Sequence, residues 1–223
     1  MPTSVSDIEE QFQENFLGPV KLGNYRDIPD EKGIYLFSTS PDKAQMGFGR
    51  KYGKVVDEAA IGRWLESAGG TIRLWDAKPG PEDLIGYLGK YWHDDEPILF
   101  IGKAQGNGSK VRTRLRQFYD HRPGSKKWHN GGQLIKTLAR WEDLNVFWLP
   151  TERPIEPELL SFFIKNNSKK CYIKKLPFAN LRGPAIFTKT PELTGWKKIE
   201  AQPRAGHHII VPALRASASM PAR

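Results

Sequence analysis

Residues 97–119 read PILFIGKAQGNGSKVRTRLRQFY, and three local patterns follow one another in this stretch. Residues 97–103 are apolar and rich in β-branched or aromatic side chains, which predicts a strand. The glycine-rich AQGNGS predicts a turn. Val111, Leu115 and Phe118 then recur at helical spacing, so the last part is expected to be an amphipathic helix with one apolar stripe.

The predicted helix is strongly basic, and its arginines differ in their position relative to the apolar stripe. At about 100° per residue, Arg114 falls at the edge of the stripe, whereas Arg112 and Arg116 lie together beyond the other edge. Arg114 is therefore the arginine expected to be half-buried.

Two further segments are predicted to be strands, GIYLFST at 33–39 and NVFWLPT at 145–151. Helical patterns are found at 57–67, 82–92 and 132–143, and another helix begins near Pro157. We therefore expect an α+β fold: a small three-stranded antiparallel sheet flanked by helices, with a large α/β insertion between the first two strands.

The chain is expected to have three parts. Residues 1–32 form an acidic N-terminal extension, 33–183 form the core, interrupted by the insertion at 40–96, and 184–223 form a C-terminal extension that ends in a disordered tail. The insertion includes a possible strand at 71–76, and another strand is expected at 207–211. His207 and His208 adjoin that strand and are assigned no role.

The charge of the chain favours a polyanionic partner. Lys and Arg number 34 against 25 Asp and Glu, which gives a net charge of +9. Residues 101–130 carry eight basic side chains and one acidic one, and residues 165–183 carry six basic side chains and no acidic one. Nucleic acid is the leading candidate partner, although a solvated basic face is the simpler interpretation.

Other classes of protein are disfavoured. No apolar run approaches the roughly 20 residues that cross a bilayer, and the polar, acidic N-terminus is unlike a secretory signal. We therefore expect a cytoplasmic protein without a membrane partner. Cys171 is the single cysteine, which excludes an intramolecular disulfide and a cysteine-based zinc cluster.

Five elements in order, GIY, FIGK, an arginine-rich helix, a glutamate at the start of a later helix and PFAN, resemble the motifs of the GIY-YIG nucleases. The match runs from about Gly33 to Asn180 with the insertion excluded. The resemblance implies a metal-dependent endonuclease that hydrolyses DNA phosphodiester bonds. It leaves open a restriction, repair or mobile-element role, the oligomeric state and the DNA recognised.

The resemblance implies roles for three residues that act on the phosphate and the attacking water. Tyr35 would accept or relay a proton from the water. A tyrosine is a poor base unless nearby cations lower its pKa, and Lys103, Arg112 and Arg114 are candidates to supply that field. Arg114 and Lys103 would stabilise the charge that grows on the phosphate.

Two further positions complete the implied site. Glu158 matches the glutamate that holds the metal, and Glu156 is a second candidate two residues away. Carboxylate oxygen suits Mg²⁺, for which Mn²⁺ is expected to substitute. Asn180 resembles an asparagine that supports the site by hydrogen bonding. Alternatively, the glutamate is favoured only by the helix dipole, and the asparagine only forms a turn.

The sequence departs from the family pattern at two places. Phe100 stands where the second motif usually has tyrosine, and Phe118 stands where the family often has His or Tyr, with Tyr119 and His121 nearby as substitutes. The departures motivate an alternative, a catalytically silent DNA-binding module on the same fold. A basic protein-interaction domain is a further alternative.

Additional DNA contacts are expected from basic residues outside the motifs. Arg112 and Arg116 are candidates on the arginine-rich helix, and Arg50 and Lys51 are candidates in a loop that mixes glycine, aromatic and basic residues. A surface loop with no partner is the alternative interpretation of that loop.

Overall fold

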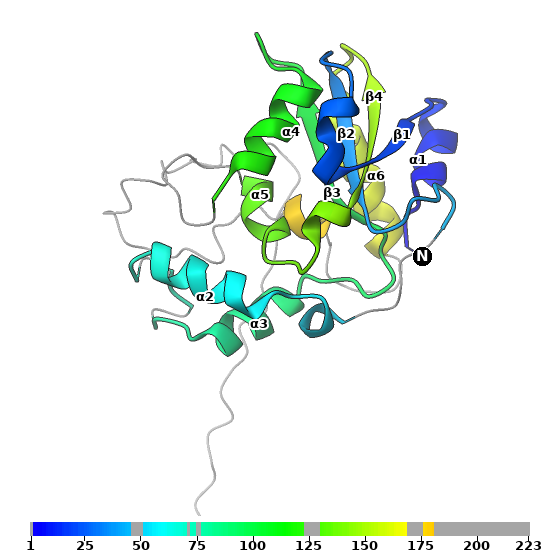
Figure 1. Ribbon diagram of the computed structural model, residues 1–223. Helices are drawn as coiled ribbons and strands as arrows, with labels where there is room; N and C mark the ends of the chain where they lie inside the picture. Colours follow the sequence, from blue (N-terminus) through cyan, green and yellow to red (C-terminus); the bar gives the residue numbers. More distant parts are fainter. Residues whose placement is uncertain are drawn as a thin grey trace, which may run out of the picture.

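The computed structural model describes residues 2–45, 51–70, 72–74, 77–122, 130–168 and 176–180. These residues form an α+β structure in which helices flank one antiparallel sheet (Figure 1). The strands are β1 (Leu17–Lys21), β2 (Gly33–Ser38), β3 (Ile98–Ala104) and β4 (Asn145–Pro150), and their order in the sheet is β1-β4-β2-β3.

The three strands predicted from the sequence are confirmed as β2, β3 and β4, but the sheet has four strands, not three. β1 lies at one edge and pairs only with β4. Its sequence, LGPVK, contains a glycine and a proline and lacks a buried apolar face, so it does not resemble a strand. Such residues are tolerated at a sheet edge, where one side of the backbone needs no partner.

The longer helices are α1 (Val5–Phe12), α2 (Glu58–Ser67), α3 (Pro81–Gly89), α4 (Val111–Asp120), α5 (Asn130–Ile135) and α6 (Glu156–Ser168). Four single-turn or short 3₁₀ helices connect them: η1 (Leu22–Asp27), η2 (Tyr52–Lys54), η3 (Trp141–Asp143) and η4 (Phe178–Asn180). α2, α3, α4 and α6 lie where the sequence predicted helices. α1 was not predicted, and the strand expected at 207–211 lies outside the described residues.

The helix predicted at 132–143 is interrupted. α5 ends at Ile135, and the backbone that follows bonds instead to the segment between β2 and β3: Asp57 N–H donates to Thr137 O, and Ala139 N–H donates to Val55 O, each at 2.7 Å. Arg140 then takes a left-handed conformation, with φ of 56°, before η3 begins. Tertiary hydrogen bonds therefore override the helical pattern.

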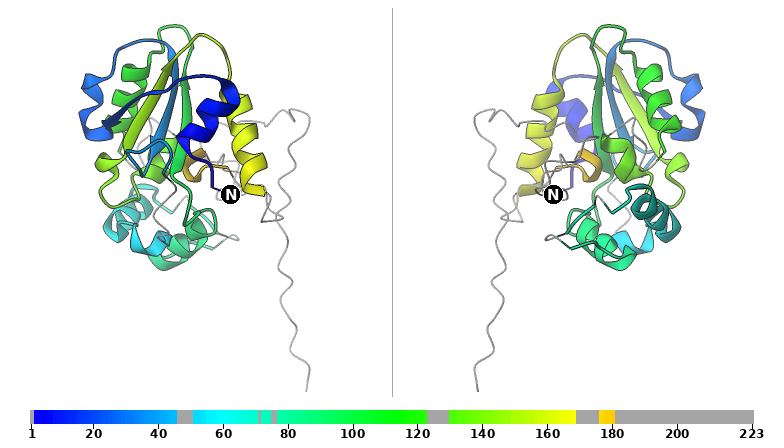
Figure 2. Two further views of the ribbon diagram at one scale, coloured as in Figure 1. Left: turned by 90° about the vertical axis from the view of Figure 1, so that its right-hand side faces the viewer. Right: turned by 90° about the vertical axis from the view of Figure 1, so that its left-hand side faces the viewer.

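Helices cover both faces of the sheet, as Figures 1 and 2 show, and an apolar layer lies on each face. On the face covered by α4, α5 and η1, here called the α4 face, the sheet contributes mainly aromatic rings, Tyr35, Phe37, Phe100 and Trp148. On the face covered by α1 and α6, the α6 face, it contributes mainly aliphatic side chains, Ile34, Leu36, Ile98, Ile101 and Leu149 together with Phe147.

The described part of the segment between β2 and β3, residues 39–97, contributes η2, α2 and α3, and α2 and α3 lie below the sheet in Figure 1. Asp57 caps α2, because its side chain accepts a hydrogen bond from Ala60 N. The strand expected at 71–76 lies partly outside the described residues, and Leu74 forms only an isolated bridge with Ala77. Among the described residues, no helix is long and apolar enough to cross a membrane.

Candidate functional site

The GIY and FIG segments lie on neighbouring antiparallel strands, and their register sets Tyr35 directly opposite Gly102. The absence of a side chain at Gly102 is necessary for this packing. A Cβ there would lie 2.5 Å from Tyr35 Cζ, 2.8 Å from Tyr35 Oη and 2.6 Å from a ring carbon of Phe100. Glycine therefore lets the Tyr35 ring lie across β3, so that the hydroxyl reaches toward that edge strand.

Tyr35 is buried, with 2% of its surface exposed, and burial raises the pKa of its hydroxyl well above the usual value. The charge of Arg114 acts in the opposite direction, and that of Glu156 raises the pKa further. Of the three cations that were candidates to lower this pKa, Arg114 acts on the hydroxyl, and desolvation outweighs its effect. Tyr35 is a neutral phenol at physiological pH.

Arg114 lies on α4 and is half-buried, as its place beside the apolar stripe predicted. Its Nη1 donates to Gln117 Oε1 at 3.1 Å, which orients the guanidinium along the helix. Arg112 and Arg116 are exposed on the same helix. The three arginines therefore separate into one that is half-buried and two that are exposed to solvent.

Lys103 and Glu156 form an ion pair at the rim of the sheet. Lys103 Nζ lies 2.9 Å from Glu156 Oε2, and the lysine side chain is 47% exposed while that of the glutamate is 9% exposed. Lys103 comes directly after Gly102 on β3, and Glu156 is the first residue of α6. The pair joins the end of β3 to the beginning of α6, and the charge of Glu156 acts on the hydroxyl of Tyr35.

Glu158, the residue that the family pattern pointed to, is exposed, whereas Glu156 is buried. The helical geometry of α6 explains the difference. Ile155, Leu159 and Phe163 are its buried stripe, and at about 100° per residue Glu156 lies about 60° from the centre of that stripe and Glu158 about 100° from it. Glu156, the second candidate, is thus the carboxylate that shares the site with Tyr35 and Lys103, and this angular difference could have been found in the sequence.

Asn180 braces the FIG strand from outside the sheet. Its Oδ1 accepts from Ile101 N and its Nδ2 donates to Ile101 O, both at 2.7 Å. Because β3 is an edge strand, this side chain occupies the position of a further strand at that residue. Its hydrogen bonds support the segment that carries Gly102 and Lys103, and they hold the backbone of β3 in place.

The turn that carries Asn180 is held by aromatic residues from the segment between β2 and β3. Phe178 packs against Tyr52 and Trp92, with ring centroids 5.2 Å away in each case, and Tyr52 and Trp92 lie 5.7 Å from each other. Tyr52 Oη also bonds to Thr137 Oγ1 at 2.7 Å. One structural role of residues 39–97 is therefore to fix η4, a role that the sequence did not reveal.

The two residues that depart from the family pattern are core residues. Phe100 and Phe118 are buried and pack with Phe37 and with each other. Gly131 on α5 makes room for Phe100, because a Cβ there would lie 2.4 Å from a ring carbon.

The suggested substitutes for Phe118 lie elsewhere in the structure. Tyr119 packs between Tyr25 and Trp141. His121 is buried, and its ring lies 3.3 Å from Gln133 Oε1. These contacts of Tyr119 and His121 are with residues other than Arg114.

Of the two loop residues expected to contact DNA, Lys51 is exposed beside η2 and Arg50 lies outside the described residues. Cys171, His207 and His208, to which the sequence assigned no functional role, also lie outside them. Within the described part of the chain, no group of three or more His, Cys, Asp or Glu side chains is arranged to hold a metal. A Mg²⁺ ion that keeps most of its waters needs only one or two carboxylates, so Glu156 fits such an ion as a single protein ligand.

Comparisons with family models, with curated proteins and with solved structures found no match for this chain. The resemblance to the GIY-YIG nucleases therefore rests on the motif residues described above.

Proposed function

We propose that the protein is a metal-dependent endonuclease that cuts DNA, built on a GIY-YIG-type core in which residues 40–96 are an insertion. The observation that carries the proposal is the arrangement at the end of β3, where Tyr35 of β2 lies opposite Gly102 and the next residue, Lys103, pairs at 2.9 Å with Glu156 of α6. The charges of Glu156 and of Arg114 on α4 act on the tyrosine hydroxyl.

The two cations would stabilise the pentacovalent phosphate. Arg114 offers a planar set of donors to phosphate oxygens, and its half-buried position shields it from bulk water, which strengthens its interaction with the growing negative charge. Lys103 adds a point charge at the exposed end of β3. The exposed Arg112 and Arg116 would contact neighbouring phosphates and add a salt-dependent contribution to binding.

Tyr35 would relay a proton and would not act as a permanently ionised base, because burial raises its pKa. As a neutral phenol it can donate one hydrogen bond and accept others, so it can orient the attacking water. As the proton of that water moves to the tyrosine oxygen, the phenol proton would move to an oxygen of the phosphate. Glu156 would hold a Mg²⁺ ion through its carboxylate. When bound, that ion would polarise the phosphate and activate water.

The two glutamates at the start of α6 provide a matched test. Supercoiled plasmid would be incubated with wild type, Glu156→Gln and Glu158→Gln, with Mg²⁺, with Mn²⁺ and with chelator. We expect metal-dependent nicking that falls by about 100-fold or more in Glu156→Gln, the size of loss seen when a group that stabilises a transition state is removed, and changes little in Glu158→Gln. Equal activity of the two variants would contradict the role of Glu156.

A second candidate is a DNA-binding module without catalysis. The raised pKa of Tyr35 and the burial of Phe100, which lacks the hydroxyl of the usual tyrosine, favour it. This candidate requires that wild type bind duplex DNA with an affinity that falls steeply as salt rises while no condition of the plasmid experiment gives nicks.

A further inference from the structure

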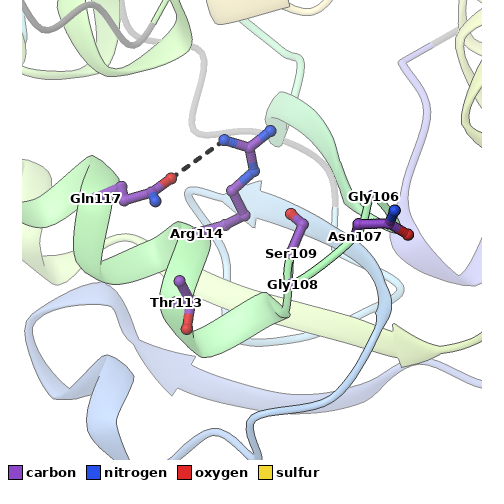
Figure 3. Close-up of a pocket in the computed structure, with 7 residues that line it drawn as sticks. All are labelled: Gly106, Asn107, Gly108, Ser109, Thr113, Arg114 and Gln117. Atoms are coloured by element: carbon purple, nitrogen blue, oxygen red, sulfur yellow. Dashed lines mark hydrogen bonds between the residues drawn. The ribbon is translucent and has the colours of Figure 1, made fainter.

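An open hollow of about 290 Å³ lies between the loop after β3 and the first two turns of α4 (Figure 3). It is lined by Gly106, Asn107, Gly108, Ser109, Thr113, Arg114 and Gln117. Gly108 has φ of 68°, and a Cβ there would meet nothing within 4 Å, so glycine is favoured by backbone conformation. The backbone of the loop at Gly108 is therefore not covered by neighbouring atoms.

The hollow contains polar groups that can donate hydrogen bonds. Arg114 carries five N–H donors, of which the bond to Gln117 uses one. Ser109 Oγ is buried and has no hydrogen-bond partner in the described part of the chain. A buried hydroxyl without a partner is unfavourable, and this one can turn about a single bond toward a ligand in the hollow.

The charge of the hollow selects an anion. Arg114 is its one ionised lining residue, and within the described residues no carboxylate forms an ion pair with it. The nearest acid that bonds to the lining is Asp30, which accepts from Thr113 N at 3.2 Å and from Thr113 Oγ1 at 3.3 Å. Asp30 thereby caps the first turn of α4, so the donors left for an anion are side chains and not the helix terminus.

We propose that this hollow binds a backbone phosphate of the nucleic acid, next to the phosphate that is cut. The inference deepens the proposed function and rests on it for the nature of the ligand. Tyr35, Lys103 and Glu156 are not among the lining residues, so an anion in the hollow lies beside the reacting group. Arg114 belongs to both places and would lie between two successive phosphates of one strand.

The sharpest test changes Gln117, because Gln117→Glu keeps the shape of the side chain and places a carboxylate beside Arg114. The control is Gln11→Glu, an exposed change on α1 that alters the net charge equally. Binding of a labelled duplex would be measured in chelator, so that cutting plays no part. We expect Gln117→Glu to bind about tenfold more weakly or worse than Gln11→Glu, as for the loss of a charged hydrogen bond.

We also expect Ser109→Ala to bind less tightly than the exposed control Ser67→Ala.

Replacing single phosphates of the duplex by neutral methylphosphonates locates the contact. In wild type, one position next to the cut site should weaken binding, and the same replacement should have no further effect in Gln117→Glu. Equal binding by Gln117→Glu and Gln11→Glu, or no binding of duplex by wild type, would overturn the inference. Plasmid nicking is a separate readout: DNA binding that depends on Gln117 without nicking would retain the phosphate site and reject the nuclease.

Discussion

The two faces of the sheet bury apolar layers that differ in size and in what they leave for chemistry, the layer on the α4 face being the larger. The α6 face is packed mainly with branched aliphatic side chains that carry no polar atom, whereas the α4 face is packed with rings, one of which is the phenol of Tyr35. Glu156 is brought to the rim by the helix of the α6 face, and Arg114 by the helix of the α4 face. The candidate site therefore lies at β3, where the helix of one face contributes the arginine and the helix of the other face contributes the glutamate.

The largest expected effect compares equal cavities on the two faces. Leu115 on α4 and Ile8 on α1 are both fully buried, and truncation of either to alanine should lower the free energy of unfolding by about 2–5 kcal/mol. Only Leu115→Ala should also reduce nicking per folded molecule, because Leu115 anchors the helix that carries Arg114. Urea unfolding and nicking at a temperature where both variants are folded would measure the two effects. If Leu115→Ala and Ile8→Ala lost the same activity per folded molecule, the two faces would not differ in their support of the site.

A smaller effect is expected when a methyl group is added to the α4 face. Gly102→Ala places a Cβ within 2.5 Å of Tyr35, and overpacking of this kind costs about 1–3 kcal/mol. It should also displace the tyrosine and reduce activity. Gly86→Ala on α3 is the control, because a Cβ there meets nothing within 4 Å, and an exposed helical glycine gains up to about 1 kcal/mol on replacement by alanine. Thermal unfolding of both variants would reveal whether close packing at Tyr35 is required.

The smallest effect concerns the far end of α4. Lys136 donates to the carbonyls of Tyr119 and His121, where α4 ends, and burial lowers its pKa to about 8, against the opposing charges of Asp120 and Glu142. In the unfolded chain the pKa of lysine is about 10.4. Between pH 8 and about 10 the unfolded state therefore binds more protons, and the free energy of unfolding should rise with pH.

Lys136→Met should lack that rise. Urea unfolding at pH 7.5 and pH 9.5 would compare it with wild type, so that other titrating groups cancel in the difference. Parallel pH dependences would show that the ammonium group is solvated as in the unfolded chain and that the α4 face is open to water at this end.

The sequence predicted those elements that are stabilised by residues close together along the chain, and it missed those that depend on distant residues. Strands β2, β3 and β4 and helices α4 and α6 could be predicted, because each has its own periodic apolar pattern. The half-buried place of Arg114 followed from its angle to the stripe of α4. β1 could not be predicted because its strand conformation comes from pairing with β4, and the helix at 132–143 failed because its backbone bonds to residues far away in the sequence.

The sequence by itself determined the order of the motifs, the basic character of α4 and the half-buried place of Arg114, since these depend on residues that are neighbours along the chain. Only the tertiary structure decided that Glu156 pairs with Lys103 of β3, that Phe178 is held by Tyr52 and Trp92, and that the pKa of Tyr35 rises. The physical reason is common to all three: burial and the approach of distant charges are set by packing between elements, which no local pattern encodes.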